Sequence, residues 1–233
     1  LLEIVSEPDL RSAAEAKAYL ADLKLLLTYL DVSDCNMQEG SLRVDANVNL
    51  HIETETGTVA TPIVEVKNMN SFRAVERALI YESQRQFEVW EETGQQLGEV
   101  PKQTRGWDDQ AQITRGQRHK EESSDYRYFP DPDLVPVKIS PEEVEVLRSE
   151  IGELPAAIRQ RLVENHGISS YTSDVLVNQG RGVVDYFVAV AQTSGDGKTA
   201  GNWVQQEVLR TLKEKEIDIE QFPLNTDELA ELL

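Results

Sequence analysis

The chain has 233 residues, of which 39% are hydrophobic, and a formal net charge of −19 at pH 7. This length suffices for two modest domains, and no run of 18 apolar residues indicates a membrane span. There are 15 basic and 25 acidic residues up to position 138 (net −10), and 8 and 17 after it (net −9). This balance excludes broad electrostatic binding of nucleic acid, so any RNA contact must be local or made by other parts. Cys35 is the only cysteine, which excludes an intrachain disulfide and predicts a cytoplasmic protein.

The first part of the sequence predicts strands and one helix. Residues 1–5 form an apolar run that predicts a buried strand. Ser12 and Glu15 have the spacing of a capping box, which predicts a helix that runs to about Leu30. Residues 41–52 alternate between apolar and polar residues, as in a half-buried strand with one polar face.

A second alternating segment, residues 63–68, follows a turn signal at residues 54–58. We expect it to form an antiparallel hairpin with residues 41–52. A long helix is predicted from Ser71 to about Thr93, with Gly94 as its stop. Next, the ranges 103–108 and 111–118 predict a further hairpin.

After Pro136 the pattern becomes helical. Ser140-Pro-Glu-Glu143 is a capping box with proline at the first helical position. Pro155 is expected to open another helix that Gly167 closes, and further helices are expected near 170–178, 183–193 and 200–215. The sequence therefore predicts an α+β protein, with an antiparallel-sheet domain over 1–138 and an all-α domain over 139–233.

Three charged residues are predicted to share one face of the first sheet. The alternation places Asp45 on the polar side of its strand, and it places Glu65 and Lys67 on the polar side of the next. A sheet face that carries both positive and negative charges can steer ammonia or ammonium, or position a carboxylate and phosphates. The alternative is a solvated sheet face, which is common in antiparallel sheets.

Glu3 is a carboxylate within an apolar run, so it must be paired, exposed or bound to a cation. A salt bridge at the end of a strand is the simplest alternative to a cation site. The three histidines, by contrast, do not cluster with carboxylates or cysteine at metal-ligand spacing.

The stretch 114–134 mixes charged and aromatic residues in a way that no core strand requires. Within it, Asp125-Tyr126-Arg127 offers a guanidinium fork for phosphate or carboxylate, a carboxylate that could orient it, and a flat ring with a polar tip. A salt-bridged loop closed by Pro130 and Pro132 is the alternative. Elsewhere, the candidates for binding phosphate or substrate are Arg105, the weaker Arg43, and Asn68, whereas a cap or a turn is a sufficient explanation for the nearby Asn70.

These motifs occur together in a recognisable order. The segments are Leu2–Asp9, Glu39–Val48, Val64–Phe72, Gln103–Asp108 and the stretch 114–134. Together they resemble the B subunit of the glutamyl/aspartyl-tRNA amidotransferase, GatB, over nearly the whole chain. One departure is Val44, where the family's strand usually carries a cysteine. The chain starts without Met and stops at Leu233 inside a helical pattern, so we expect a fragment that lacks the first part of the catalytic domain and most of the tail.

The resemblance implies a fold and a reaction. It implies a catalytic "cradle" domain with the architecture of glutamine synthetase, followed by a helical domain that runs into a truncated YqeY-like tail. The implied enzyme is an ATP-dependent carbon–nitrogen ligase that takes its amide nitrogen from glutamine. It converts Glu-tRNA(Gln) to Gln-tRNA(Gln), or Asp-tRNA(Asn) to Asn-tRNA(Asn), by phosphorylating the side-chain carboxylate and displacing phosphate with ammonia.

The resemblance also implies roles and partners. Glu3 would be a ligand of the Mg²⁺ at the ATP site, and the face that carries Asp45, Glu65 and Lys67 would line the path of ammonia. We therefore expect Asp45, Glu65, Lys67 and Arg127 to be catalytic, and Arg43, Asn68, Arg105, Asp125 and Tyr126 to bind ATP or substrate. The expected partners are the A and C subunits and the misacylated tRNA, which the missing tail would mainly hold.

Two other functions remain open at this level. The chain could be a scaffold fragment that docks on the A and C subunits and is inactive alone. It could also belong to a ligase of the glutamine-synthetase kind that acts on a free amino acid.

Overall fold

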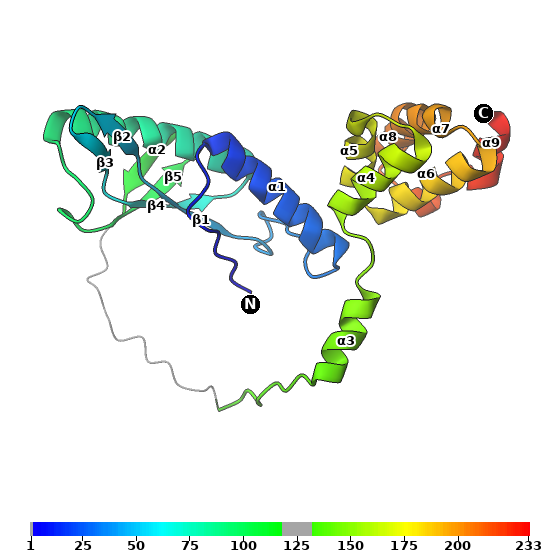
Figure 1. The fold of residues 1–233 in the computed structure, drawn as a ribbon, viewed down its shortest axis with the longest axis horizontal. Helices are drawn as coiled ribbons and strands as arrows, with labels where there is room; N and C mark the ends of the chain where they lie inside the picture. The colour runs from blue at the N-terminus through cyan, green and yellow to red at the C-terminus, as the bar shows by residue number, and fades with distance from the viewer. Residues whose placement is uncertain (1, 118–131) are drawn as a thin grey trace. The chain divides into compact units, whose positions relative to one another are not determined.

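The computed structural model describes residues 2–117 and 132–233 (Figure 1). Contacts divide the chain into two units. The first comprises Leu1–Lys24 and Asp34–Pro136, and the second comprises Leu25–Ser33 and Val137–Leu233. Within the described ranges, no helix is both long and apolar enough to cross a membrane.

A four-stranded sheet is the centre of the described part of the first unit. Its strands, in spatial order, are β1 (Val44–Val48), β4 (Val64–Met69), β5 (Gln103–Asp108) and β6 (Ile113–Gly116). The β1–β4 and β5–β6 pairs are antiparallel, whereas β4 and β5 are parallel. A parallel pair needs a long crossover, and here the crossover contains helix α2 (Phe72–Thr93), which lies along one face of the sheet (Figure 1).

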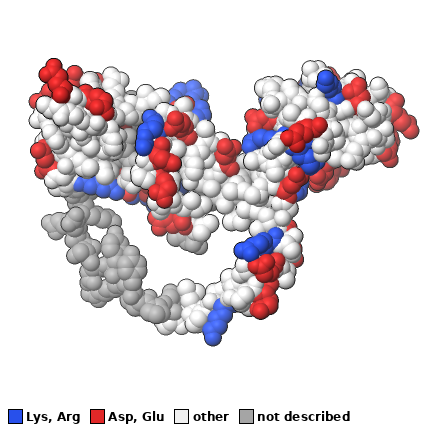
Figure 2. Space-filling view, viewed as in Figure 1, with Lys and Arg blue, Asp and Glu red and all other residues white. Residues whose placement is uncertain are grey.

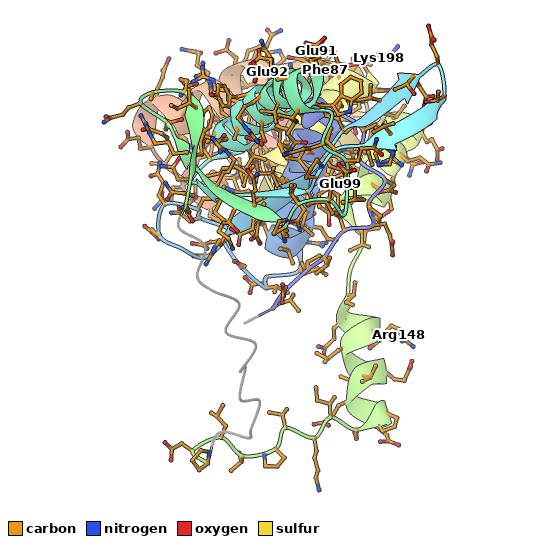
Figure 3. All side chains as sticks on the ribbon, turned by 90° about the vertical axis from the view of Figure 1, so that its left-hand side faces the viewer. Phe87, Glu91, Glu92, Glu99, Arg148 and Lys198 are labelled. Carbon is orange, nitrogen blue, oxygen red and sulfur yellow. The ribbon has the colours of Figure 1, made fainter. Side chains whose placement is uncertain are left out.

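Helix α2 has the ends that the sequence predicts. The Ser71 hydroxyl accepts a hydrogen bond from the backbone N–H of Ala74 at 3.0 Å, and Gly94 ends the helix in the left-handed conformation. Its inner face packs on the sheet, whereas Phe87, Glu91 and Glu92 project from the helix in Figure 3 and are exposed.

The core of the first unit lies between this helix and the sheet. Its buried residues come from β4, β5, α2 and the helix α1 (Ala13–Tyr29); they are Leu20, Val64, Val66, Met69, Ala74, Val75, Ala78, Leu79 and Trp107. The other face of the sheet carries the polar residues of the alternating pattern, so the sheet is apolar on one side and polar on the other.

The predicted strand over 41–52 is two strands in two sheets. Its second part is β2 (His51–Thr54), which pairs with β3 (Gly57–Ala60) in a separate hairpin. Thr61 makes the division, because its hydroxyl accepts from the backbone N–H of Leu50 at 2.8 Å and its own N–H donates to the Leu50 carbonyl at 2.9 Å. The predicted turn around Gly57 is confirmed, and so is the antiparallel pairing of β1 with β4, but the turn joins β2 to β3.

The buried strand predicted over residues 1–5 is wrong. Residues 2–5 have no strand partner among the described residues, and Leu2 and Val5 are 68% and 82% exposed. An apolar run forms a buried strand only where another strand pairs with it and a hydrophobic core packs against it. The helix that follows begins as predicted, since the Ser12 hydroxyl accepts from the N–H of Glu15 at 3.1 Å.

The hairpin of β5 and β6 is confirmed. Its connection is closed by the Asp108 carboxylate, which accepts hydrogen bonds from the backbone N–H groups of Gln110 and Ala111 at 3.1 and 2.9 Å.

The second unit is helical. Its main helices are α3 (Pro141–Glu150), α4 (Pro155–His166), α5 (Ser170–Asn178), α6 (Arg181–Ser194), α7 (Gly197–Trp203), α8 (Leu209–Lys215) and α9 (Thr226–Leu232). The capping box at Ser140 and the αL stop at Gly167 are both present, as predicted. A short π-helical stretch, Val204–Val208, lies between α7 and α8 inside the helix expected over 200–215.

His166 gives the second unit a pH dependence that can be measured. Its ring packs edge-on to Phe187 at 5.3 Å between centroids, and burial, with a smaller contribution from Arg161, lowers the pKa of His166 below 6.5. The unfolded chain therefore binds more protons than the folded chain just below pH 6.5, so this contribution to stability is lost as the pH falls through that range. We expect His166→Gln to show a smaller loss of unfolding free energy between pH 7 and pH 5 than wild type, measured by urea denaturation. Equal losses in the two proteins would contradict the prediction.

Candidate functional site

The candidate site is the side of the sheet opposite α2, which we call the polar face. It consists of the residues Arg43, Asp45, Glu65, Lys67, Lys102, Thr104, Gly106, Asp108 and Arg115. Strand register brings them together: Glu65 pairs with Thr104, and Gly106 pairs with both Lys67 and Arg115. Paired residues on neighbouring strands project to the same side of a sheet. Over the molecule as a whole, acidic and basic side chains are interspersed on the side shown in Figure 2.

Lys67 is the centre of an ion-pair cluster on this face. Its ammonium nitrogen lies 3.1 Å from a carboxylate oxygen of Asp45 and 3.3 Å from one of Glu65. The Lys67 side chain is 28% exposed, so the cluster is partly shielded from water but remains open to a ligand. The structure thus brings together the three residues that the alternation predicts.

Each carboxylate of the cluster has further partners. The guanidinium of Arg43 binds both oxygens of Asp45, at 2.9 and 3.3 Å. Glu65 accepts a hydrogen bond from the Thr104 hydroxyl at 3.3 Å and lies 3.8 Å from the ammonium of Lys102. These contacts fix the carboxylates in place, and polar groups held in place before substrate arrives favour catalysis.

The electrostatics make Lys67 a permanent cation. Burial lowers the pKa of Lys67, but its hydrogen bonds with Asp45 and Glu65 outweigh burial, so the pKa is raised above its ordinary value. An ammonium with a raised pKa cannot serve as a general base near neutral pH. Its chemical use is therefore to stabilise negative charge on a bound or reacting group.

A β-bulge sets the direction of Lys67. Between the pairs Ala46↔Val66 and Val44↔Met69, the single residue Asp45 on β1 lies opposite two residues on β4. The second of these is Asn68, whose φ of 65° is left-handed, a conformation that asparagine tolerates better than most residues. The Asn68 side-chain amide donates to the Trp107 carbonyl at 3.1 Å, which anchors the bulge to β5. The sequence did not predict this bulge at Asn68.

An open pocket of about 380 Å³ lies on the polar face next to Lys67. It is lined by Asn68, Gly106, Trp107, Asp108, Asp109, Gln110, Arg115, Gly116 and Gln117. Gly106 contributes no side chain beside Lys67, and the side chain of Gln117 lies over the strand there, since a Cβ at Gly106 would be 2.5 Å from the Gln117 amide nitrogen. Arg115 and Asp108 form an ion pair at 2.9 Å beside it. The backbone N–H of Ala111, assisted by Arg115, holds the pKa of Asp108 below its usual value.

Arg105 does not belong to this face. Because Thr104 and Gly106 project to the polar side of β5, Arg105 between them projects toward α2, where it donates to the hydroxyl and the carbonyl oxygen of Thr114 at 2.8 and 2.7 Å. The guanidinium of Arg105 thus lies on the side of the sheet away from the polar face, and its predicted role in binding phosphate or substrate stays a prediction.

The remaining predicted site residues are not brought together. Glu3 lies in an exposed segment without regular structure. The part of the chain that the structure describes contains no group of three or more His, Cys, Asp or Glu that could hold a metal ion. Asp125, Tyr126 and Arg127 lie outside the described residues, so their roles stay predictions.

Part of the polar face was not predicted as a site. The residues that sequence reasoning missed all flank or belong to the hairpin strands; they are Lys102, Thr104, Gly106, Asp108 and Arg115. Their sequence carries little signal, because residues 103–108 and 113–116 do not alternate between apolar and polar residues as the first pair of strands does. What the sequence does not contain is the parallel pairing of β4 with β5, which places the two hairpin strands beside Lys67.

Comparison with known proteins identifies the family of this chain. A family model described as "GatB/GatE catalytic domain" matches residues 1–145, and one described as "GatB domain" matches residues 185–233. The relatives include the B subunit of the aspartyl/glutamyl-tRNA(Asn/Gln) amidotransferase of Rhodopirellula baltica, which is 61% identical over 233 residues, all of this chain and 47% of that protein. The B subunits of the same enzyme from Prosthecochloris aestuarii and Moorella thermoacetica are 49% and 46% identical over the whole chain, and 47% and 48% of those proteins are covered.

The chain thus spans about half the length of the curated relatives that it matches. The catalytic-domain model covers more than half of the chain, and the second model covers its C-terminal part. The chain belongs to the GatB/GatE family.

Proposed function

We propose that this chain forms part of the site at which a tRNA-bound glutamate or aspartate is amidated, as the B subunit of a tRNA-dependent amidotransferase. The observation that supports this most directly is the fixed cation Lys67 between Asp45 and Glu65, beside an open pocket. Membership of the GatB/GatE family and the names of the relatives supply the reaction class.

The chemistry that we propose has two steps. A carboxylate is a poor electrophile, so one of its oxygens first takes the terminal phosphoryl group of ATP, which gives an acyl phosphate and ADP. The nitrogen of ammonia then attacks the carbonyl carbon, the carbon–oxygen bond to phosphate breaks, and the amide and inorganic phosphate are formed with loss of a proton from nitrogen. Both steps depend mainly on positioning and on stabilising negative charge.

The polar face offers groups for these tasks. Lys67 would stabilise charge on phosphate or on the attacked carbonyl oxygen, because its raised pKa keeps it cationic. Asp45 and Glu65 are hydrogen-bond acceptors that would hold ammonium or ammonia near this point. Arg115 would be the nearest further cation for a phosphate in the pocket.

Magnesium is part of the proposal for the whole enzyme, together with ATP. Among the described residues only Glu3 was predicted as a ligand, and it is exposed with no carboxylate or histidine cluster around it. The described residues therefore do not make up a magnesium site.

The remaining parts of the proposal concern the assembled enzyme. We propose glutamine as the source of ammonia, the A and C subunits as partners, a catalytic domain with the architecture of glutamine synthetase, and a cytoplasmic location. The misacylated tRNA would be held mainly by the part of the relatives' length that this chain does not span.

The test uses the full-length protein assembled with its partner subunits. We expect amide formation on Glu-tRNA(Gln) or Asp-tRNA(Asn) that requires ATP, measured by analysis of the amino acid released from the tRNA. Ammonium chloride in place of glutamine should also support the reaction, since it bypasses glutamine hydrolysis. Amidation of free glutamate at a comparable rate would instead identify a ligase of the glutamine-synthetase kind. A reaction unaffected by Asp45→Asn and Glu65→Gln would show that this chain is a scaffold.

A further inference from the structure

The inner face of α2 contains a buried carboxylate, Glu82, which is 0% exposed. A charged side chain in this position is costly unless other groups satisfy it. Arg85, one turn along the helix, approaches both of its oxygens, at 2.5 and 3.0 Å. The Gln86 side-chain amide on the same helix also donates to Glu82, at 3.4 Å, and Glu82 reaches the sheet as well.

The contacts with the sheet join α2 to both strands of the hairpin. The Thr114 hydroxyl on β6 donates to Glu82 at 2.6 Å, and the Arg105 guanidinium on β5 lies 3.5 Å from the same carboxylate oxygen. Arg105 in turn holds Thr114 through two hydrogen bonds, to the hydroxyl and to the carbonyl oxygen. Burial and the nearby charge of Arg85 lower the pKa of Arg105, and Glu82 opposes both effects.

The residues on the two sides of the hairpin alternate. Arg105 stands between Thr104 and Gly106 on β5, and Thr114 immediately precedes Arg115 on β6. A displacement of Arg105 or Thr114 on the inner side must therefore move their neighbours on the polar face. Gly106 pairs with both Lys67 and Arg115, so the pocket beside Lys67 depends on this register.

We propose that Glu82 is a positioning residue, whose buried carboxylate holds Arg105 and Thr114 so that Thr104, Gly106 and Arg115 keep their places beside Lys67 on the polar face. The inference rests on the proposed function, because it takes the polar face as the place of amidation. A role confined to stability would require only that α2 and the sheet stay packed. A positioning role predicts that the rate changes while the fold is intact.

The decisive pair of variants is Thr114→Val and Thr114→Ser, in the full-length protein assembled with its partner subunits. Valine has nearly the shape of threonine but cannot donate to Glu82 or accept from Arg105, whereas serine retains both hydrogen bonds. We expect Thr114→Val to lower kcat for ammonium-dependent amidation by roughly 10- to 100-fold, on the scale of lost support behind a catalytic group. Thr114→Ser should restore most of the rate. Both are measured well below the melting temperature.

Two further variants separate positioning from stability. Glu82→Gln should lower kcat about as much as Thr114→Val does. The double variant should lower kcat by less than the product of the two separate fold-losses, because both substitutions break the same network. Val75→Ala removes buried volume from the same helix, two turns before Glu82, without touching the network. It should lower the melting temperature and leave kcat unchanged. Amide hydrogen exchange along 113–116 should rise in Thr114→Val but not in Val75→Ala.

The outcomes are distinct. If wild type amidates and Thr114→Val has the wild-type kcat, the positioning role is overturned and the proposed function stands. If Val75→Ala loses as much rate as Thr114→Val at equal loss of melting temperature, the network acts only through stability. A wild-type complex that cannot amidate tRNA-bound carboxylates overturns the proposed function, and the positioning role with it.

Discussion

Replacing Lys67 with methionine is expected to lower the rate of ammonium-dependent amidation by the assembled full-length protein by about 10²–10³-fold, on the scale of removing one preorganised electrostatic group. Methionine keeps an unbranched side chain of similar length but removes the charge that lies 3.1 Å from Asp45 and 3.3 Å from Glu65. If glutamine is the source of ammonia, as we propose, glutamine hydrolysis by the assembled protein should continue, because the proposed role of Lys67 is confined to amide formation. The measurement is kcat for amide formation with ammonium, beside the rate of glutamate release from glutamine.

Lys102→Met is the matched control for this experiment. Lys102 also pairs with Glu65, but at 3.8 Å and with a side chain that is 48% exposed. Exposed pairs of this kind contribute little, about 0–1 kcal/mol. We expect its rate to stay within a few-fold of wild type. Equal effects of the two substitutions would mean that Lys67 supplies only general positive charge, and an unchanged rate in Lys67→Met would remove the polar face as the site of chemistry.

Phe187→Ala is expected to destabilise the second unit by about 3–5 kcal/mol, the usual cost of deleting a fully buried aromatic ring. Phe187 is 0% exposed on α6, and its ring packs against His166. It also approaches Gly201 of α7, where a Cβ would lie 3.6 Å from the ring. The cavity left by alanine would therefore remove packing contacts between α6 and its neighbours α4 and α7. The measurement is the unfolding free energy from hydrogen exchange of the slowest amides in α6.

Tyr171→Ala is the control in the same unit, because Tyr171 is 69% exposed and its loss should change the free energy by no more than about 0.5 kcal/mol. Amides of the first unit serve as an internal reference, since the chain contains two units whose unfolding need not coincide. A loss below about 1 kcal/mol for Phe187→Ala would mean that neighbouring side chains collapse into the vacated space.

Local signals in the sequence account for most of the helices and for the ion-pair cluster around Lys67 on the polar face. Ser71 and Gly94 define the ends of α2 because capping depends on the residues at the ends themselves. Asp45, Glu65 and Lys67 could be placed on one face for a similar reason, since alternation is a property of each strand alone.

Long-range pairing accounts for what could not be predicted. The division of 41–52 into β1 and β2 depends on Thr61, whose side chain reaches Leu50 from eleven residues away. The run at residues 2–5 has the composition of a strand, but composition does not supply a partner. Arg105 was proposed for its chemical type, and only the pairing of β5 with β4 and β6 shows that its side chain lies on the side opposite Thr104 and Gly106.

The parallel pairing of β4 with β5 also has a consequence for the order of folding. Val64 pairs with Gln103, so this part of the sheet can form only after the intervening chain, including all of α2, has been synthesised and closed into a loop. Such non-local contacts form slowly compared with a hairpin. Lys67 and Glu65 are near neighbours on one strand and can meet early, whereas the pocket at Gly106 exists only once the crossover is complete. A nascent chain released before β5 emerges would therefore carry the ion pair without the cavity beside it.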